Sequence, residues 1–340
     1  MIRKRICPHA RPIRPLTFCL SRRRLLADNP PVIELKQIRG KQVQLDFAEP
    51  NTCLHTHSTT GRLIQEWRSV SKPAWKILNG PAKETLDLIA DKSIDCVVTS
   101  PPYFWLRDYK VDGQIGLEDS VDAYVAAIKE VMKKVRSKLQ PEGVLFLNLG
   151  DTYYSGKGEP HGPDKKSSKR RFGLRAVDKS GGLGIGLQRK SVIGIPWRVA
   201  LELCLDNWIL RSPIIWHREN CMPEPTAKDR PSRSYEFVFM FVKSRKYFFN
   251  KKNLPNDNWT EDVWNIAARP KMNGSVDTAP FPEELVERCL AVGCKPGGTV
   301  LDPFCGSGTT IRVSVREGRS AIGIDLSRNF CEYAVKSLPA

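Results

Sequence analysis

Short apolar runs rich in β-branched residues alternate along this chain with longer amphipathic stretches. Such runs, bounded by charged or turn-forming residues, are typical of strands buried on both faces of a parallel sheet. In the longer stretches apolar residues recur every three or four positions, which predicts helices. The helices are expected at about 82–90, 121–139, 196–206, 282–292, 309–317 and 328–336. This alternation predicts an α/β, doubly wound, Rossmann-like fold with a mostly parallel sheet.

The order of the predicted strands indicates that both ends of the chain enter one sheet. Only one helix follows the strand that ends at Asp325, so the C-terminal half of the sheet lacks a third strand. Residues 74–80 can supply that strand. The expected strands are 74–80, 94–98, 144–149, 298–302 and 321–325, with a hairpin formed by 208–216 and 235–242.

The first candidate site is Thr99-Ser100-Pro101-Pro102-Tyr103, directly after the strand predicted at 94–98. Ligands of open α/β sheets bind at the carboxyl ends of the strands. The proline rings fix φ and remove N–H donors, so the carbonyls of Ser100 and Pro101 are rigid acceptors. Rigid acceptors beside an aromatic ring suit the exocyclic amino group of an extruded nucleobase. The alternative is a Pro-Pro turn with an incidental tyrosine.

The second candidate site is Asp302-Pro303-Phe304-Cys305-Gly306-Ser307-Gly308-Thr309, between a predicted strand and a predicted helix. Glycines there let the backbone approach a ligand, and a helix N-terminus offers N–H groups. The segment is neither a Walker A loop nor a complete G-x-G-x-x-G, because Ile311 replaces the third glycine. Asp325, at the end of the next strand, suits ribose hydroxyls, with a helix N-cap as the alternative.

Together the two segments resemble the catalytic and cofactor motifs of amino-methylating DNA methyltransferases. These enzymes use S-adenosyl-L-methionine to modify the N4 amine of cytosine or the N6 amine of adenine. The catalytic motif precedes the cofactor motif, as in the circularly permuted β group of that family. Similar blocks extend the resemblance over residues 75–337, at 142–151, 195–198, 214–216 and 281–286.

The resemblance implies direct methyl transfer and assigns a role to each matching residue. Ser100 and the Pro101 carbonyl would accept hydrogen bonds from the target amine, and Tyr103 would stack on the extruded base. Asp151 is a candidate second acceptor, with a helix-cap or turn role as the alternative. The expected catalytic residues are Ser100, Pro101, Pro102, Tyr103 and Asp151. The expected cofactor-binding residues are Asp302, Pro303, Phe304, Gly306, Gly308, Thr309, Asp325, Phe281 and Pro282.

Two positions depart from the family pattern near the expected cofactor site. Pro81 follows Gly80 where an acid is frequent, and Asp277 stands where His or Lys is common. Neither position belongs to the transfer chemistry.

The charge of the chain favours a polyanionic partner. With 54 basic and 37 acidic residues, the net charge is +17, which fits a polyanion or an anionic surface. The resemblance implies double-stranded DNA with a flipped target base as the partner. A basic loop at 155–192 is expected to contact DNA, with a solvated charge run as the alternative. Its charge is concentrated in Lys165, Lys166, Lys169, Arg170 and Arg171. A segment at 217–276 is the candidate for target recognition.

The extent of the resemblance divides the chain into an extension and one large domain. Residues 1–73 form a basic extension, expected to be partly disordered, and 74–340 form the permuted domain. That domain has a catalytic half at 92–250 and a cofactor half at 277–340 that includes the strand 74–80. Residues 1–27 carry eight Lys or Arg and no acid, so a transit peptide or basic arm is the alternative to a disordered leader.

Several other classes of site find no support in the sequence. No apolar run reaches the roughly 18 residues of a membrane span. Ten cysteines without a C-x-x-C pair indicate reduced intracellular thiols. We expect a cytoplasmic, nucleoid-associated location, with organelle targeting by the basic leader as the alternative. Residues 53–57 hold one cysteine and two histidines at a spacing that matches no zinc pattern, so no metal is expected.

Ser100 favours cytosine N4 as the target, because serine before Pro-Pro-Tyr is associated mostly with cytosine-N4 enzymes of the family. The association is imperfect, and adenine N6 is the alternative. An RNA methyltransferase and an inactive nucleic-acid-binding protein of the same fold are further alternatives. We expect a site-specific enzyme of a restriction-modification or related DNA-marking system, in which a restriction endonuclease is a possible partner.

Overall fold

The computed structural model describes one compact unit, which lies within Ile33–Ala340. The described residues are 33–34, 54–55, 62–69, 72–154, 187–188, 190–221, 224, 228–253, 261–269 and 281–338, with side chains from residue 73 onward. Two short strands, β1 (Ile33–Glu34) and β2 (Leu54–His55), form a separate parallel pair.

One nine-stranded sheet organises the described residues, in the order β3-β4-β11-β10-β5-β6-β8-β7-β9. Its central strands from β4 to β6 are parallel, β3, β8 and β7 join by antiparallel pairing, and β9 runs parallel to β7. The strands are β3 (Arg62–Ser69), β4 (Lys72–Asn79), β5 (Ile94–Thr99), β6 (Leu139–Leu149), β7 (Ile209–His217), β8 (Tyr235–Val242), β9 (Val263–Asn265), β10 (Thr299–Asp302) and β11 (Ser320–Asp325).

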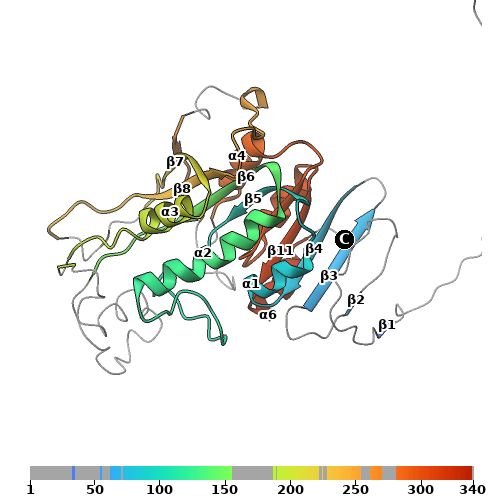
Figure 1. Ribbon diagram of the computed structural model, residues 1–340, viewed down its shortest axis with the longest axis horizontal. Helices are drawn as coiled ribbons and strands as arrows, with labels where there is room; N and C mark the ends of the chain where they lie inside the picture. The colour runs from blue at the N-terminus through green and yellow to red at the C-terminus, as the bar shows by residue number, and fades with distance from the viewer. Residues whose placement is uncertain are drawn as a thin grey trace, which may run out of the picture. The chain divides into compact units, whose positions relative to one another are not determined.

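The two ends of the chain do meet in this sheet. Strand β4 pairs in parallel with β11 from Trp75 opposite Ala321 to Asn79 opposite Asp325 (Figure 1). This confirms the strand count made on the sequence. The sheet also reaches further toward the N-terminus than residue 74, because β3 pairs with β4. Strand β9 is a second edge strand that the sequence did not predict.

Helices cover both faces of the sheet, which confirms the doubly wound α/β fold. Side chains of α1, α2 and α3 pack on one face, and those of α4, α5 and α6 pack on the other. The stretch predicted as one helix at 82–90 is a short helix and a 3-10 turn, η1. The elements are α1 (Ala82–Thr85), η1 (Leu86–Leu88), α2 (Val121–Lys138), α3 (Ile195–Leu205), α4 (Glu283–Gly293), α5 (Thr309–Arg316) and α6 (Arg328–Lys336).

Alternation along the central strands explains this double covering. On β5, Val97 packs with the α2 side of the sheet, while Cys96 and Val98 pack with the α4 side. All three are buried. Because both faces of β5 are apolar, the strand is held in the middle of the sheet and its carboxyl end stays fixed. Among the described helices, none is long and apolar enough to cross a membrane.

Candidate active site

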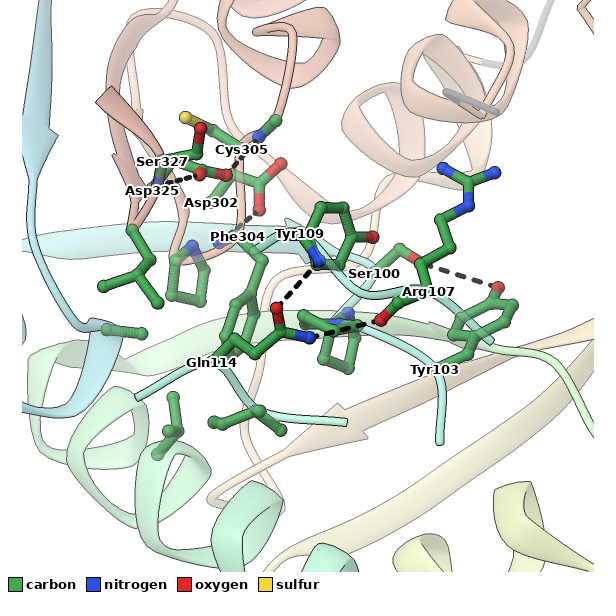
Figure 2. Close-up of a pocket in the computed structure, with 18 of the residues that line it drawn as sticks. Ser100, Tyr103, Arg107, Tyr109, Gln114, Asp302, Phe304, Cys305, Asp325 and Ser327 are labelled. Atoms are coloured by element: carbon green, nitrogen blue, oxygen red, sulfur yellow. Dashed lines mark hydrogen bonds between the residues drawn. The ribbon is translucent and has the colours of Figure 1, made fainter. Parts of the chain in front are cut away.

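A cavity of about 910 Å3 opens at the carboxyl ends of β5, β10 and β11. Figure 2 shows the segment after β5 facing the glycine-rich segment after β10 across it. The structure thus brings together the two candidate sites. Of the residues expected at the site, those that line the cavity are Ser100, Pro101, Pro102, Tyr103, Phe281, Asp302, Pro303, Phe304, Gly306, Thr309 and Asp325.

The glycine-rich segment turns tightly at two left-handed residues. Gly306 has φ +51° and Gly308 has φ +81°, values that favour glycine. A Cβ on Gly308 would lie 2.8 Å from Cβ of Ala334 on α6, so a side chain there would force the loop away from that helix. Gly308 does not line the cavity; its role is to let α5 begin at Thr309, which does.

The carboxyl group of Asp325 closes the glycine-rich turn. Its Oδ2 accepts a hydrogen bond of 2.9 Å from the N–H of Gly306, and its Oδ1 accepts one of 2.8 Å from Ser327. Ser327, not Asp325, is the N-cap residue of α6. Asp325 is therefore not the N-cap residue that the alternative interpretation expected. It lines the cavity, where a ligand can reach its carboxyl group.

Asp302 is a buried junction between the two motifs. Its carboxyl group accepts hydrogen bonds from Thr99 at 2.7 Å, from Thr310 at 2.6 Å and from the N–H of Phe304 at 3.1 Å. The residue is 1% exposed. Burial raises the pKa of Asp302 to about 6, against the lowering effect of these hydrogen bonds. Part of its role is therefore to hold β5, β10 and α5 in register.

Tyr103 is held by two residues that the sequence did not point to. Its hydroxyl donates toward Oε2 of Glu236 on β8 at 2.5 Å and lies 3.1 Å from Oδ1 of Asn148 on β6. Ser100 Oγ is 3.4 Å from the same oxygen (Figure 2). Both new residues line the cavity. A polar residue within an apolar strand was the available signal: Asn148 within 144–149 and Glu236 within 235–242.

Gly150 provides the surface on which the ring of Tyr103 rests. A Cβ on Gly150 would lie 2.5 Å from Cε2 of Tyr103, closer than any side chain can approach. This close packing and the hydroxyl contacts hold the ring in one orientation. Tyr103 therefore presents a fixed ring at the cavity.

Asp151 does not lie at the site. Its Oδ1 accepts hydrogen bonds from the N–H groups of Thr152, Gly194 and Ile195, the last being the first residue of α3, and it is not among the residues that line the cavity. Of its two expected roles, the structure supports the helix-cap role. Pro282 is likewise outside the lining and precedes α4 as its N-cap residue.

The loop between β5 and α2 contributes several residues to the lining of the cavity. Its ends are joined by the hydrogen bond from Trp105 N to the carbonyl of Gly116, at 2.6 Å. Gln114 braces its middle, accepting from Tyr109 N at 2.8 Å and donating to the carbonyl of Arg107 at 3.2 Å (Figure 2). The ring of Tyr109 contacts Phe330 on α6, 6.0 Å between centroids. This loop therefore connects the segment after β5 to the helix that follows Asp325.

The residues expected to contact DNA are only partly described. The basic run Lys165, Lys166, Lys169, Arg170 and Arg171 lies outside the described residues, as do Asp277 and most of 155–192. In 217–276, Arg218 lines the cavity, and Trp264 is 2% exposed and belongs to the core. Among the described residues, no group of three or more His, Cys, Asp or Glu is arranged to hold a metal ion.

Comparison with known proteins identifies the family. Residues 94–336 match the DNA methylase family N6_N4_Mtase. The type II methyltransferase M.Cfr9I of Citrobacter freundii is 39% identical over 268 residues, covering 77% of this chain and 87% of that protein. The type II methyltransferase M.XycI of Xanthomonas campestris pv. cyanopsidis is 40% identical, with the same shares covered.

Solved structures agree with this match. The structure of TTHA0409 from Thermus thermophilus, complexed with S-adenosyl-L-methionine, superposes with a TM-score of 0.52 and 25% identity over 76% of this chain and 92% of its own. The PvuII DNA methyltransferase, described as cytosine-N4-specific, shares the fold at a TM-score of 0.59 and 20% identity, over 79% and 89%. The family match and the relatives show that the chain belongs to the N6/N4 family of DNA methylases.

Proposed function

We propose that the protein transfers a methyl group from S-adenosyl-L-methionine to the N4 amine of cytosine in double-stranded DNA. The observation that carries the proposal is the shared cavity, which Ser100 and Pro101 line together with the glycine-rich segment that begins at Asp302. Membership of the DNA methylase family supports the reaction class and the cofactor.

The residues on the glycine-rich side fit this cofactor. Phe304, Leu326 and Phe330 line that side and offer apolar surface for an adenine ring. A carboxylate oxygen can accept more than one hydrogen bond, so Asp325 can accept a ribose hydroxyl in addition to the backbone N–H groups it already binds. The left-handed Gly306 lets the backbone approach the ligand. When bound, the cofactor supplies a methyl group on a positively charged sulfur.

The residues on the catalytic side fit an amine. The lone pair of an exocyclic amine is delocalised into the base, so the amine is a weak nucleophile. Ser100 Oγ and the Pro101 carbonyl would each accept one N–H, which favours a pyramidal nitrogen with an available lone pair. This is positioning and electrostatic stabilisation in a partly dry site. The ring of Tyr103 would stack on the extruded base.

Ser100 supports cytosine over adenine. A hydroxyl is neutral, whereas the carboxylate associated with adenine-N6 members is negatively charged and the carboxamide carries N–H donors of its own. The type II relatives support a restriction-modification role, in which an endonuclease that cuts the same sequence would be the partner.

The product decides between the two amines. Unmethylated genomic DNA is incubated with the protein and S-adenosyl-L-methionine, digested to nucleosides and measured by mass spectrometry. N4-methylcytosine is the expected product, and N6-methyladenine alone would refute the cytosine assignment. Ser100→Ala should remove most of the product, while sequencing with modification detection identifies the target sequence.

A further inference from the structure

The hydroxyl of Tyr103 is surrounded by three polar side chains with different capacities. Oε2 of Glu236 at 2.5 Å and Oδ1 of Asn148 at 3.1 Å are acceptors. Oγ of Ser100, at 3.4 Å, belongs to a hydroxyl that can either donate or accept. Tyrosine has one proton to donate, and the carboxylate at the shortest distance binds it most strongly. The tyrosine proton is therefore directed to Glu236.

The neighbours of Asn148 fix which of its amide atoms faces Tyr103. Its Nδ2 donates to the carbonyl of Phe237 at 3.1 Å and lies 3.4 Å from Oε2 of Glu236. The amide must then turn its oxygen to the tyrosine. Because Asn148 is 4% exposed, the side chain has little room to flip. Asn148 therefore adds a second acceptor beside the Tyr103 hydroxyl and no donor.

An ion pair holds Glu236 in place behind the tyrosine. Arg218 Nη1 lies 3.4 Å from Oε1 of Glu236, and the two side chains are 21% and 15% exposed. Arg218 is itself held by a hydrogen bond of 3.2 Å to the carbonyl of Arg233. Burial raises the pKa of Tyr103 well above its ordinary value, and the charge of Glu236 raises it further. Tyr103 therefore stays protonated and can donate its hydrogen bond to Glu236.

The direction of the last hydrogen bond follows from these contacts. With its proton on Glu236, the oxygen of Tyr103 offers only lone pairs toward Ser100. Ser100 must then donate its own proton to Tyr103, which leaves the lone pairs of Oγ for other partners. An exocyclic amine presents N–H donors, so it requires an acceptor at this position.

We propose that Glu236 is a positioning residue that acts through Tyr103 and holds Ser100 as a hydrogen-bond acceptor for the target amine. The relay consists of Ser100, Tyr103 and Glu236, and the inference rests on the proposed function. It orients the lone pairs of a neutral serine toward the amine, while the charged carboxylate of Glu236 acts from the far side of the Tyr103 hydroxyl. Stacking on the base is a property of the Tyr103 ring, whereas this role belongs to its hydroxyl.

The test measures single-turnover methyl transfer with tritiated S-adenosyl-L-methionine and unmethylated genomic DNA. Tyr103→Phe keeps the ring and removes the relay, and Glu236→Leu removes its terminal acceptor. Each should lower the transfer rate by about 10- to 100-fold, the effect of losing one hydrogen bond to a charged group. Glu236→Gln keeps an acceptor oxygen and should retain more activity than Glu236→Leu.

Two further measurements separate the relay from a loss of structure. Cofactor affinity measured by calorimetry should stay within about twofold of wild type in each variant, because the relay does not line the glycine-rich side. The double variant Tyr103→Phe/Glu236→Leu should be no slower than Tyr103→Phe, since both changes break one pathway. Tyr333→Phe, which removes the hydroxyl of an exposed tyrosine outside the cavity, should transfer at the wild-type rate.

Three results would overturn the relay: a wild-type rate in Tyr103→Phe, multiplied losses in the double variant, or equal losses in Glu236→Gln and Glu236→Leu. Each of these leaves the proposed function standing, because the wild-type protein still produces methylated DNA. A wild-type protein that methylates no DNA at all removes the proposed function and the relay with it. The expected pattern in rate, with unchanged cofactor affinity, supports both.

Discussion

Thr99, the last residue of β5, donates a hydrogen bond of 2.7 Å to the carboxyl group of Asp302, the last residue of β10. The two residues are 203 positions apart, and both are buried. Ser100 follows directly after Thr99, and the glycine-rich segment begins at Asp302. This contact therefore joins the catalytic motif to the cofactor motif through a single buried carboxyl group.

The ionisation of Asp302 should make stability depend on pH. The ordinary pKa of an aspartate side chain is 3.8, and burial raises the pKa of Asp302 to about 6 in the folded protein. Between these values the folded state binds more protons than the unfolded state, so this carboxyl group stabilises the fold at low pH and the benefit is lost as pH rises through about 6. We therefore compare the free energy of unfolding of wild type with that of Asp302→Asn. The difference, wild type minus variant, should fall by roughly 2 to 3 kcal/mol from about pH 4 to about pH 7.

Urea unfolding at a series of pH values provides this measurement. The asparagine variant is the control for every other titrating group, because only the carboxyl group of residue 302 is removed. Parallel stability curves for the two proteins would show that Asp302 does not titrate in this range.

An alanine at Gly306 should weaken cofactor binding because of its position at the cavity, and not only because of the backbone strain it introduces. Gly306 and Gly318 both have positive φ, +51° and +75°, so alanine at either should destabilise the fold by about 1 to 2 kcal/mol. Gly306 lines the cavity, whereas Gly318 is exposed beyond α5, where a Cβ would contact nothing within 4 Å. Calorimetry should show affinity for S-adenosyl-L-methionine lowered about tenfold or more in Gly306→Ala and unchanged in Gly318→Ala.

Asp325→Ala should weaken the same affinity, because it removes the carboxyl group that holds the Gly306 N–H. Unchanged affinity in both Asp325→Ala and Gly306→Ala, with both variants folded, would remove the glycine-rich segment from the cofactor site.

The support that Gly150 gives to Tyr103 can be tested with a matched core substitution. A Cβ on Gly150 would lie 2.5 Å from Cε2 of Tyr103, and a Cβ on Gly293 would lie 2.4 Å from Cε2 of Phe146, away from the cavity. Both alanine variants should lose about 1 to 3 kcal/mol of stability through overpacking. Only Gly150→Ala should also slow methyl transfer, on the order of 10- to 100-fold, because it displaces the ring proposed to stack on the target base. Equal transfer rates in the two variants would contradict this.

DNA binding should lose salt dependence when the basic run is neutralised. Replacing Lys165, Lys166, Lys169, Arg170 and Arg171 by glutamine should weaken binding, and each lost phosphate contact should reduce the log–log salt slope by about 0.9. Titration of DNA at several salt concentrations measures the slope, and cofactor affinity serves as the control that should not change. An unchanged slope would identify the run as a solvated loop.

Local features of the sequence were enough to predict the fold class, every helix except the one expected at 82–90, and the meeting of the two chain ends. The period of apolar residues can be read from neighbouring positions in the sequence. The backbone restrictions of Pro101, Gly306 and Gly308 are also local, because each acts within its own turn. The two motifs could therefore be located before any contact was known. The edge strands β3 and β9 were missed, because such strands are specified by the neighbour they pair with more than by their own pattern.

The partners of Tyr103 were decided only by the tertiary structure. Asn148 lies on β6 and Glu236 on β8, and they meet the tyrosine because of the register that sets Leu149 opposite Phe237. A slip of one residue would turn both side chains to the other face of the sheet. Asp151 shows the converse: its position after a strand suggested chemistry, but the neighbouring start of α3 engages its carboxyl oxygen. The sequence by itself determined which elements form and where the two motifs lie; the pairing of distant strands decided which side chains complete the site.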